Sequence, residues 1–128
     1  MLHPTNGIGY VSSEYGYRIH PISGEKKFHT GIDIAGNNNS PIYAAQEGRV
    51  IYAGERGGYG LTVIIIHDNG LVTLYAHCSS LSVREGQNIE KGEHISNVGS
   101  TGNSTGPHVH FEIRVGIDGE TLNPRNFL

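Results

Sequence analysis

The chain has 128 residues, eight histidines, one cysteine and a formal net charge of −3 with the histidines neutral. This length suits a modest core, so we expect residues 1–128 to form a single domain. No run of Lys or Arg favours nucleic acid or an anionic membrane, and no apolar run approaches the roughly 20 residues of a membrane span. The single Cys78 excludes an internal disulfide and a cysteine-based zinc site, whereas the histidines hint at a metal.

Nineteen glycines and five prolines stand against few helix-forming runs, which predicts turns and short strands. We expect residues 12–21 to be a loop with a short strand, with His20 in a loop or at the rim of a site. A strand is expected at 48–54, after a lead-in at 42–45. Residues 61–67 are apolar on both faces, which predicts a strand at the centre of the core.

His29 and Asp33 lie four residues apart. On a straight strand they would be about 13 Å apart at about 3.3 Å per residue, too far to share an ion. Gly31 argues against a helix but permits a sharp bend that would bring the two side chains together. The same spacing also fits a buried Asp that caps a turn beside an unrelated exposed His.

Asp68-Asn69-Gly70 is a strong hairpin signal between the strand at 61–67 and a return strand at 71–78. His67 ends the first strand near this turn, and we expect its side chain to be solvated. His77 ends the return strand, where it is either a satisfied histidine at the core edge or a functional residue.

Short strands separated by glycine turns are expected over residues 79–105, which fits a compact barrel-like sandwich in an all-β-dominated fold. Cys78 should point away from His77 as a buried, inert thiol. His94 lies among turn residues and is expected to be spare. The loop at 100–106 precedes a histidine-bearing strand and is placed to border a groove.

The stretch 106–113 alternates cleanly and predicts a strand with two unlike faces. One face is apolar and the other carries imidazoles: Val109, Phe111 and Ile113 against His108, His110 and Glu112. Same-face neighbours lie about 6.6 Å apart, so their rings can converge on one site. Either both histidines bind a metal, or one binds while the other handles a proton. A pair of surface histidines on an edge strand would give the same pattern.

Together, His29, Asp33 and one of His108 and His110 make a His-Asp-His set. Three N/O ligands with the fourth position left to water is the pattern of a catalytic zinc site. Bound zinc lowers the pKa of its water to about 7 and polarises a carbonyl, which suits amide hydrolysis. His77 and the remaining histidine of the pair could then take the proton and stabilise the oxyanion. No H-E-x-x-H motif supplies a zincin glutamate.

At these residues the chain resembles the lysostaphin/LytM-type zinc endopeptidases, which cut peptide bridges in bacterial peptidoglycan. The resemblance covers nearly the whole chain, and its motifs are specific in their order and spacing. They are Tyr15-Gly16-Tyr17-Arg18-Ile19-His20-Pro21, His29-Thr30-Gly31-Ile32-Asp33, Gly48-Arg49-Val50, Tyr75-Ala76-His77 and the segment 102–112. The implied fold is a twisted antiparallel β-sheet with an open substrate groove, of the duplicated hybrid motif type.

Carried over by position, the resemblance implies that His29, Asp33 and His110 hold one Zn²⁺ per chain. It implies that His77 and His108 are catalytic, which chooses between the two histidines of the pair. The expected activity is zinc-dependent endopeptidase action on peptidoglycan stem peptides or cross-bridges, by a monomer outside the cell or in the cell wall. No signal peptide opens this chain, and no inhibitory pro-segment is present, so we expect an open groove and an active enzyme.

Three other interpretations remain. The chain could be a non-hydrolytic cell-wall-binding or regulatory module of the same fold, although all five His and Asp positions are present. A cupin-type metal barrel also uses H-x-H, but its metal site normally includes a Glu at short spacing. This interpretation also gives no reason for Asp33 four residues after His29. A biotinyl or lipoyl carrier matches the rhythm of 82–99, but the hairpin tip at 68–70 has no lysine to modify. The sequence is compatible with cleavage of either a glycyl-glycine or a D-alanyl-diaminopimelate bond.

Overall fold

The structure is a computed structural model that describes residues 1–19 and 23–128, so His20 lies outside the described residues. The described part holds twelve strands, two short 3-10 helices and no α-helix, as predicted for an all-β-dominated chain. The strands are β1 (Tyr10–Ser13), β2 (Gly16–Ile19), β3 (Lys26–His29), β4 (Ile32–Ala35), β5 (Pro41–Tyr43), β6 (Gly48–Glu55), β7 (Leu61–Ile66), β8 (Leu71–Leu81), β9 (Asn88–Ile89), β10 (His94–Val98), β11 (His108–Val115) and β12 (Thr121–Leu122). The 3-10 helices are η1 (Gly57–Tyr59) and η2 (Pro124–Asn126). Among these elements there is no helix with the length and apolar character that crossing a membrane requires.

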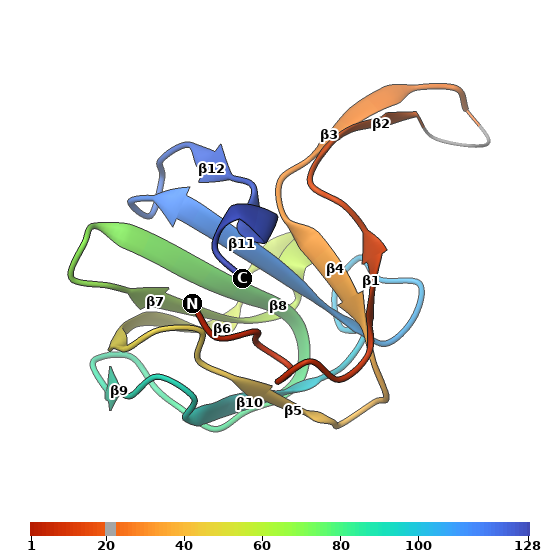
Figure 1. Ribbon diagram of the computed structural model, residues 1–128. Coiled ribbons are helices and arrows are strands. Elements are labelled where there is room, and N and C mark those ends of the chain that lie inside the picture. The colour runs from red at the N-terminus through yellow and green to blue at the C-terminus, as the bar shows by residue number, and fades with distance from the viewer. Residues whose placement is uncertain (20–22) are drawn as a thin grey trace.

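The main sheet is antiparallel and runs in the order β1-β4-β11-β8-β7-β6-β9 (Figure 1). The long strand β8 is its spine, because β8 pairs with β11 and β7 and then, at its far end, with β10. In the described residues β1 and β9 end this path, so the strands do not close into a barrel. The predicted twisted antiparallel sheet is therefore confirmed.

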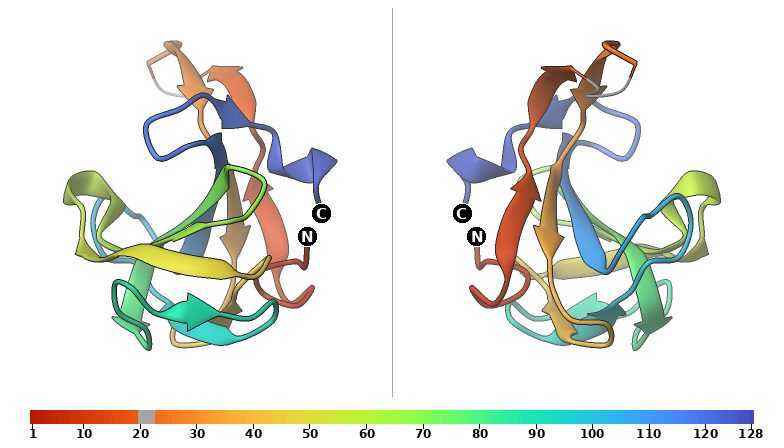
Figure 2. Two further views of the ribbon diagram at one scale, coloured as in Figure 1. Left: turned by 90° about the vertical axis from the view of Figure 1, so that its left-hand side faces the viewer. Right: turned by 90° about the vertical axis from the view of Figure 1, so that its right-hand side faces the viewer.

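The chain termini meet beside this sheet, and both views in Figure 2 place them close together. The amino group of Met1 donates a hydrogen bond to the carbonyl of Phe127 at 3.0 Å. The two ends of the described chain are therefore joined to each other beside the sheet.

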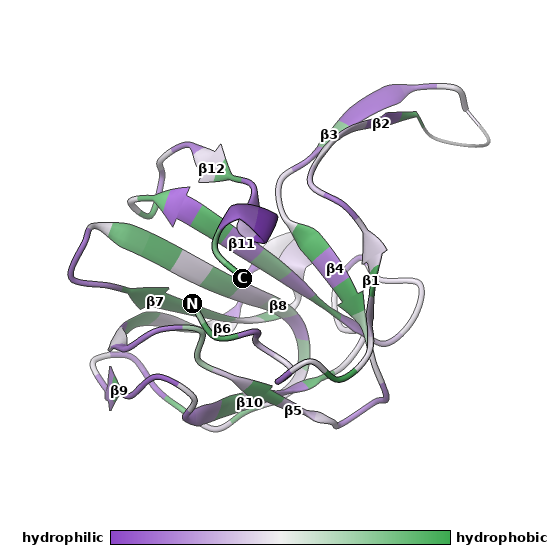
Figure 3. Ribbon diagram, viewed as in Figure 1, coloured by the Kyte–Doolittle hydropathy of each residue, from purple (hydrophilic) through white to green (hydrophobic). Residues whose placement is uncertain are grey.

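The central strands bury apolar side chains on both faces of the sheet. One face carries the larger cluster, with Ile32, Ile65, Tyr75 and Phe111 among its members. The other carries a smaller cluster of Ile64, Val72, Leu74 and Ala76. Figure 3 shows the apolar stretches on β7 and β8. Each fully buried side chain of this size contributes about 1.5–3 kcal/mol, so these strands hold the site rigidly.

The predicted hairpin joins β7 to β8, and Gly70 in its turn has a φ of 80°. The expectation that His67 is solvated was wrong, because its side chain is buried. Its Nδ1 lies 2.6 Å from the carbonyl oxygen of Glu47 and its Nε2 lies 2.9 Å from the hydroxyl of Thr73. These two hydrogen bonds replace those that the imidazole would make with water. Thr73 lies on the predicted return strand, but the sequence pattern does not place Glu47 beside His67.

Strands β2 and β3 form a separate two-stranded hairpin that projects from the main sheet (Figure 1). Tyr17 and Phe28 pair across it, with ring centroids 4.9 Å apart in a T-shaped arrangement. Arg18 stands on the opposite face from these rings, because neighbouring residues of a strand point to opposite sides. The chain enters β4 directly from this hairpin.

Candidate metal centre

The sharp bend that the sequence permits between His29 and Asp33 is present. His29 ends β3, and Gly31 passes so close to β11 that a Cβ there would lie 2.3 Å from the carbonyl oxygen of Phe111. Glycine is needed at this point for the close approach of two backbones. The bend places Nε2 of His29 3.2 Å from Oδ1 of Asp33.

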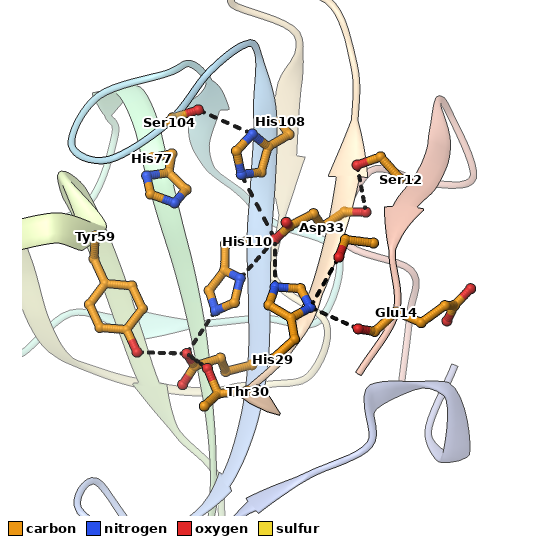
Figure 4. A network of polar contacts seen from close by, with 12 residues as sticks. Ser12, Glu14, His29, Thr30, Asp33, Tyr59, His77, Ser104, His108 and His110 are labelled. Atoms are coloured by element: carbon orange, nitrogen blue, oxygen red, sulfur yellow. Dashed lines mark hydrogen bonds and ion pairs between the residues drawn. The ribbon is translucent and has the colours of Figure 1, made fainter. Parts of the chain in front are cut away.

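Strand register brings the third member of the cluster to the same point. β11 lies beside β4 with His110 opposite Asp33, and Nδ1 of His110 is 2.8 Å from Oδ1 of Asp33. One donor atom from each of His29, Asp33 and His110 lies within 4.8 Å of the other two. Figure 4 shows the three side chains converging from β3, β4 and β11. The structure thus joins residues that are up to 81 positions apart in the sequence.

In both imidazoles, the ring nitrogen that faces away from Asp33 contacts another group. Nδ1 of His29 lies 2.8 Å from the carbonyl oxygen of Glu14, and Nε2 of His110 lies 2.7 Å from Oε2 of Glu112. When a neutral ring donates the N–H that faces away from Asp33, its other nitrogen presents a lone pair toward Asp33. Two imidazole nitrogens and one carboxylate oxygen are donors that suit Zn²⁺. The residues present therefore fit that ion.

Glu112 contacts the cluster through His110, although the sequence alone assigned it no role. Its carboxylate is fully buried, and Oε2 accepts hydrogen bonds from Thr30 and Tyr59 at 2.7 Å each. Arg114 donates to Oε1 at 2.6 Å and to the hydroxyl of Tyr59 at 3.1 Å. The signal was the H-x-H-x-E alternation, which puts Glu112 on the imidazole face of β11 beside His110.

The charges of this cluster are strongly coupled. Burial alone would raise the pKa of Asp33, but hydrogen bonds from His110 and His29 hold it well below its usual range. Burial opposes the charged form of His110, yet the hydrogen bonds to Asp33 and Glu112 outweigh it and raise the pKa to about 9. Without a metal, the site therefore holds a proton on His110 between two carboxylates, and a cation that binds there must displace it.

Two further histidines, His77 and His108, stand beside this cluster, and among the described residues neither makes a hydrogen bond through Nε2. The rings of His77 and His108 have centroids 4.8 Å apart. Nδ1 of His77 lies 2.7 Å from the carbonyl of Thr101, and Nδ1 of His108 lies 2.9 Å from that of Gly106. Nε2 of His108 points toward Asp33 at 3.8 Å (Figure 4). Both rings can thus give or take a proton at Nε2.

His77 reaches this position through an uncommon backbone conformation. Its φ is 61°, in the left-handed region that a residue with a Cβ seldom adopts. Burial lowers the pKa of His77, against the hydrogen bond to the carbonyl of Thr101, and the neighbouring imidazoles lower it further. A neutral ring at pH 7 is the form that can accept a proton.

The cluster lies at the floor of a groove of about 650 Å³. Arg18 from β2 and Tyr59 from η1 line it, as does the loop from Asn103 to Thr105. The prediction that the loop at 100–106 borders a groove is confirmed. A second hollow of about 660 Å³, lined in part by Glu47 and His67, includes none of the residues of the cluster.

The chain belongs to Peptidase family M23, whose family profile matches residues 27–124. It is 50% identical over 114 residues to DD-carboxypeptidase/endopeptidase Mpg of Neisseria meningitidis serogroup B, covering 89% of this chain and 26% of that protein. It is 43% identical over 99 residues to murein hydrolase activator NlpD of Escherichia coli, covering 77% of this chain and 25% of that protein. This chain therefore spans about a quarter of the length of these relatives.

Solved structures show the same fold. A zinc-containing peptidase from Vibrio cholerae superposes with a TM-score of 0.85 at 29% identity, over 94% of this chain and 37% of the other. The catalytic domain of lysostaphin from Staphylococcus simulans superposes with a TM-score of 0.83 at 28% identity, over 96% of this chain and 93% of the other. The resemblance to the lysostaphin/LytM-type peptidases is therefore confirmed, as is the expected fold.

Proposed function

We propose that this chain is a zinc-dependent peptidase domain that hydrolyses peptide bonds in the stem peptides or cross-bridges of peptidoglycan. The observation that carries the proposal is the convergence of His29, Asp33 and His110, beside two histidines whose Nε2 atoms make no hydrogen bond within the described part of the chain. Membership of Peptidase family M23 supports it, and so does the structural likeness to a zinc-containing peptidase.

His29 would hold the ion through Nε2, Asp33 through Oδ1 and His110 through Nδ1, because these atoms face one another. Zn²⁺ in such a site supplies a Lewis acid that polarises a carbonyl and lowers the pKa of water to about 7. The carbonyl of Glu14 and the carboxylate of Glu112 fix the orientation of the two rings.

His77 and His108 carry the proton transfers in this proposal. Hydrolysis adds the oxygen of one water to the carbonyl carbon, breaks the C–N bond and delivers a proton to the departing amine. A neutral imidazole at the groove floor can take the proton from water at Nε2 and return it to the amine, while the other ring, in its protonated form, would donate its Nε2–H to the oxyanion. Neither residue is needed as a ligand, so each is free for this role.

A second candidate function is a non-hydrolytic regulator of wall enzymes. The observation that favours it is the 43% identity to a protein named murein hydrolase activator. Against it, all five positions of the site carry His or Asp, and a module without chemistry has no need of His77 in a costly conformation. The catalytic proposal accounts for both features.

The proposed setting follows from the relatives. Mpg, NlpD and lysostaphin carry names of wall-active or antimicrobial proteins, which supports action in the cell wall or outside the cell. We propose that residues 1–128 work as one domain and as a monomer, with peptidoglycan peptides as the partner.

The test is digestion of purified peptidoglycans of several cross-link types, with products identified by mass spectrometry, with and without a chelator. Cleavage of one linkage by the zinc-loaded protein, lost with chelator and restored by zinc, is the expected result. A zinc-loaded, folded protein that cleaves no wall would reject the catalytic proposal in favour of the regulator.

A further inference from the structure

Among the described residues, one Arg or Lys side chain lines the groove beside the histidine cluster. Arg18 projects from β2 on the groove side of the β2–β3 hairpin. Its guanidinium donates a hydrogen bond to Oγ of Ser13, and that oxygen lies 3.5 Å from Nδ1 of His29. Arg18 is therefore linked to a proposed metal ligand through the hydroxyl of Ser13.

The charge of Arg18 is not neutralised within the described part of the chain, where its hydrogen-bond partner is a neutral hydroxyl. Among the described groove residues, Asp33 is the one acidic side chain, and its carboxylate is committed to His29 and His110. By contrast, Arg125 is paired with Glu14 and Arg114 with Glu112. Arg18 is thus a groove cation without an acidic partner.

An exposed guanidinium with this surrounding fits a carboxylate on the substrate, because its planar fork of N–H donors matches two carboxylate oxygens. We propose that Arg18 is a specificity-determining residue that binds a free carboxylate next to the scissile bond. This inference rests on the proposed function and narrows its substrate class. The substrate would be a peptide whose leaving amine is the amino group of an amino acid with a free carboxylate.

Peptidoglycan bonds differ in whether the amino acid that supplies the leaving amine has a free carboxylate. In a D-alanyl-D-alanine terminus and in a D-alanyl-diaminopimelate cross-link, the carbon that bears the leaving nitrogen also bears a carboxylate. In the interior of a glycyl-glycine bridge, that carbon is joined to the next amide and carries no charge. Arg18 would therefore favour the first two bonds over the third. The same contact with a carboxylate would act in trimming stem ends and in cutting cross-links.

The same hairpin supplies a matched control. Lys26 lies on β3, outside the groove, and its ammonium stands 4.5 Å from the centre of the Tyr17 ring. Tyr17 and Lys26 occupy the face of the hairpin opposite to Arg18, by strand alternation and the register of β2 with β3. Lys26→Gln therefore removes the same charge from the same hairpin without changing the groove.

The test uses two synthetic stem peptides that end in D-alanyl-D-alanine and differ only at the last group, a free acid or a carboxamide. A second pair is a cross-linked dimer with the diaminopimelate carboxylate beside the scissile bond free or amidated. Zinc-loaded wild type, Arg18→Gln, Arg18→Lys and Lys26→Gln are compared by kcat/KM on each peptide, and zinc content is measured for each protein.

Wild type is expected to prefer the acid by about tenfold or more, since a charge-assisted hydrogen bond is lost with the amide. The ratio of kcat/KM for the acid to kcat/KM for the amide should fall close to one in Arg18→Gln. It should be intermediate in Arg18→Lys and equal to the wild-type ratio in Lys26→Gln. Equal cleavage of acid and amide by wild type, or a wild-type preference in zinc-loaded Arg18→Gln, would overturn the inference alone. Cleavage of none of the four peptides by wild type would instead reject the proposed function, and the inference with it.

Discussion

The buried carboxylate of Glu112 holds His110 from behind. Oε2 accepts hydrogen bonds from His110, Thr30 and Tyr59, and Oε1 accepts one from Arg114, so both oxygens have partners. Burial would raise the pKa of Glu112, but these partners, His110 first, lower it to about 2. Glu112 therefore stays ionised and fixes the proton of His110 on Nε2, which leaves Nδ1 free for a metal.

Replacing Glu112 by Gln should weaken zinc binding by about 10- to 100-fold, the usual effect of losing such an outer partner. The reason is that the amide no longer fixes the proton of His110, and Arg114 loses its anion. The measurement is a competition titration against a chromophoric chelator, with circular dichroism to establish folding. Glu25→Gln, at an exposed carboxylate, should bind zinc like wild type. Unchanged affinity in folded Glu112→Gln would show that Glu112 does not position His110.

At the scale of elements, β8 changes face at His77. Thr73 and Tyr75 point into the larger core, and Val72, Leu74 and Ala76 point to the other face. Strict alternation would send His77 into the larger core, but its positive φ turns the ring toward His108 and returns Cys78 to that core. The backbone at one residue thus decides whether β8 contributes to the site.

A non-glycine residue in the left-handed region costs about 1–2 kcal/mol. His77→Gly should therefore be more stable to urea than His77→Ala by about 1 kcal/mol, although both variants lose the catalytic ring. Chemical denaturation of the two zinc-loaded variants at one pH measures the difference. An alanine variant as stable as the glycine variant would mean that the backbone relaxes and that no strain is held there.

Local signals predicted much of this arrangement. Gly31 marked the bend, the 68–70 turn marked the hairpin and the 106–113 alternation marked the histidine face. The position of His77 was beyond local signals, because alternation alone would have directed its ring into the core. Tyr59 and Arg114 could not be assigned to the site either, since only the assembled sheet brings η1 and the end of β11 to Glu112.

At the scale of the whole molecule, a buried polar chain ties two loops to the core. The amide of Ala45 donates to the hydroxyl of Tyr75, which lies 2.9 Å from the hydroxyl of Thr73, and Thr73 in turn reaches Nε2 of His67. Nδ1–H of His67 donates a hydrogen bond to the carbonyl of Glu47. This chain of donors requires a neutral imidazole. Sequence alone could not reveal it, because its members lie on three separate segments.

Burial lowers the pKa of His67 from its ordinary 6.5, against the effects of the Glu47 carbonyl and Asp68. The unfolded chain therefore takes up a proton at His67 before the folded chain does, and stability falls as pH drops below about 6.5. His67→Gln should be less stable than wild type by about 1–2 kcal/mol at pH 7.5, because it loses hydrogen bonds. The difference in stability should be smaller at pH 5. Protonation of His67 in the unfolded chain destabilises the wild type there, whereas the variant has no imidazole at this position to protonate.

Urea denaturation of both proteins at the two pH values measures the gap. Asp68→Asn, at the turn, serves as a control for the adjacent charge. A gap that is as wide at pH 5 as at pH 7.5 would show that His67 is not held neutral by the fold.

The central claim is that His29, Asp33 and His110 hold one zinc ion while His108 acts on the substrate. The most direct measurement is zinc stoichiometry together with peptidoglycan cleavage, for wild type, His110→Ala and His108→Ala under the same conditions. We expect one zinc per chain in wild type and in His108→Ala, none retained in His110→Ala, and cleavage by wild type alone. A His110→Ala protein that keeps its zinc and cuts peptidoglycan, or a His108→Ala protein that loses its zinc, would contradict the account.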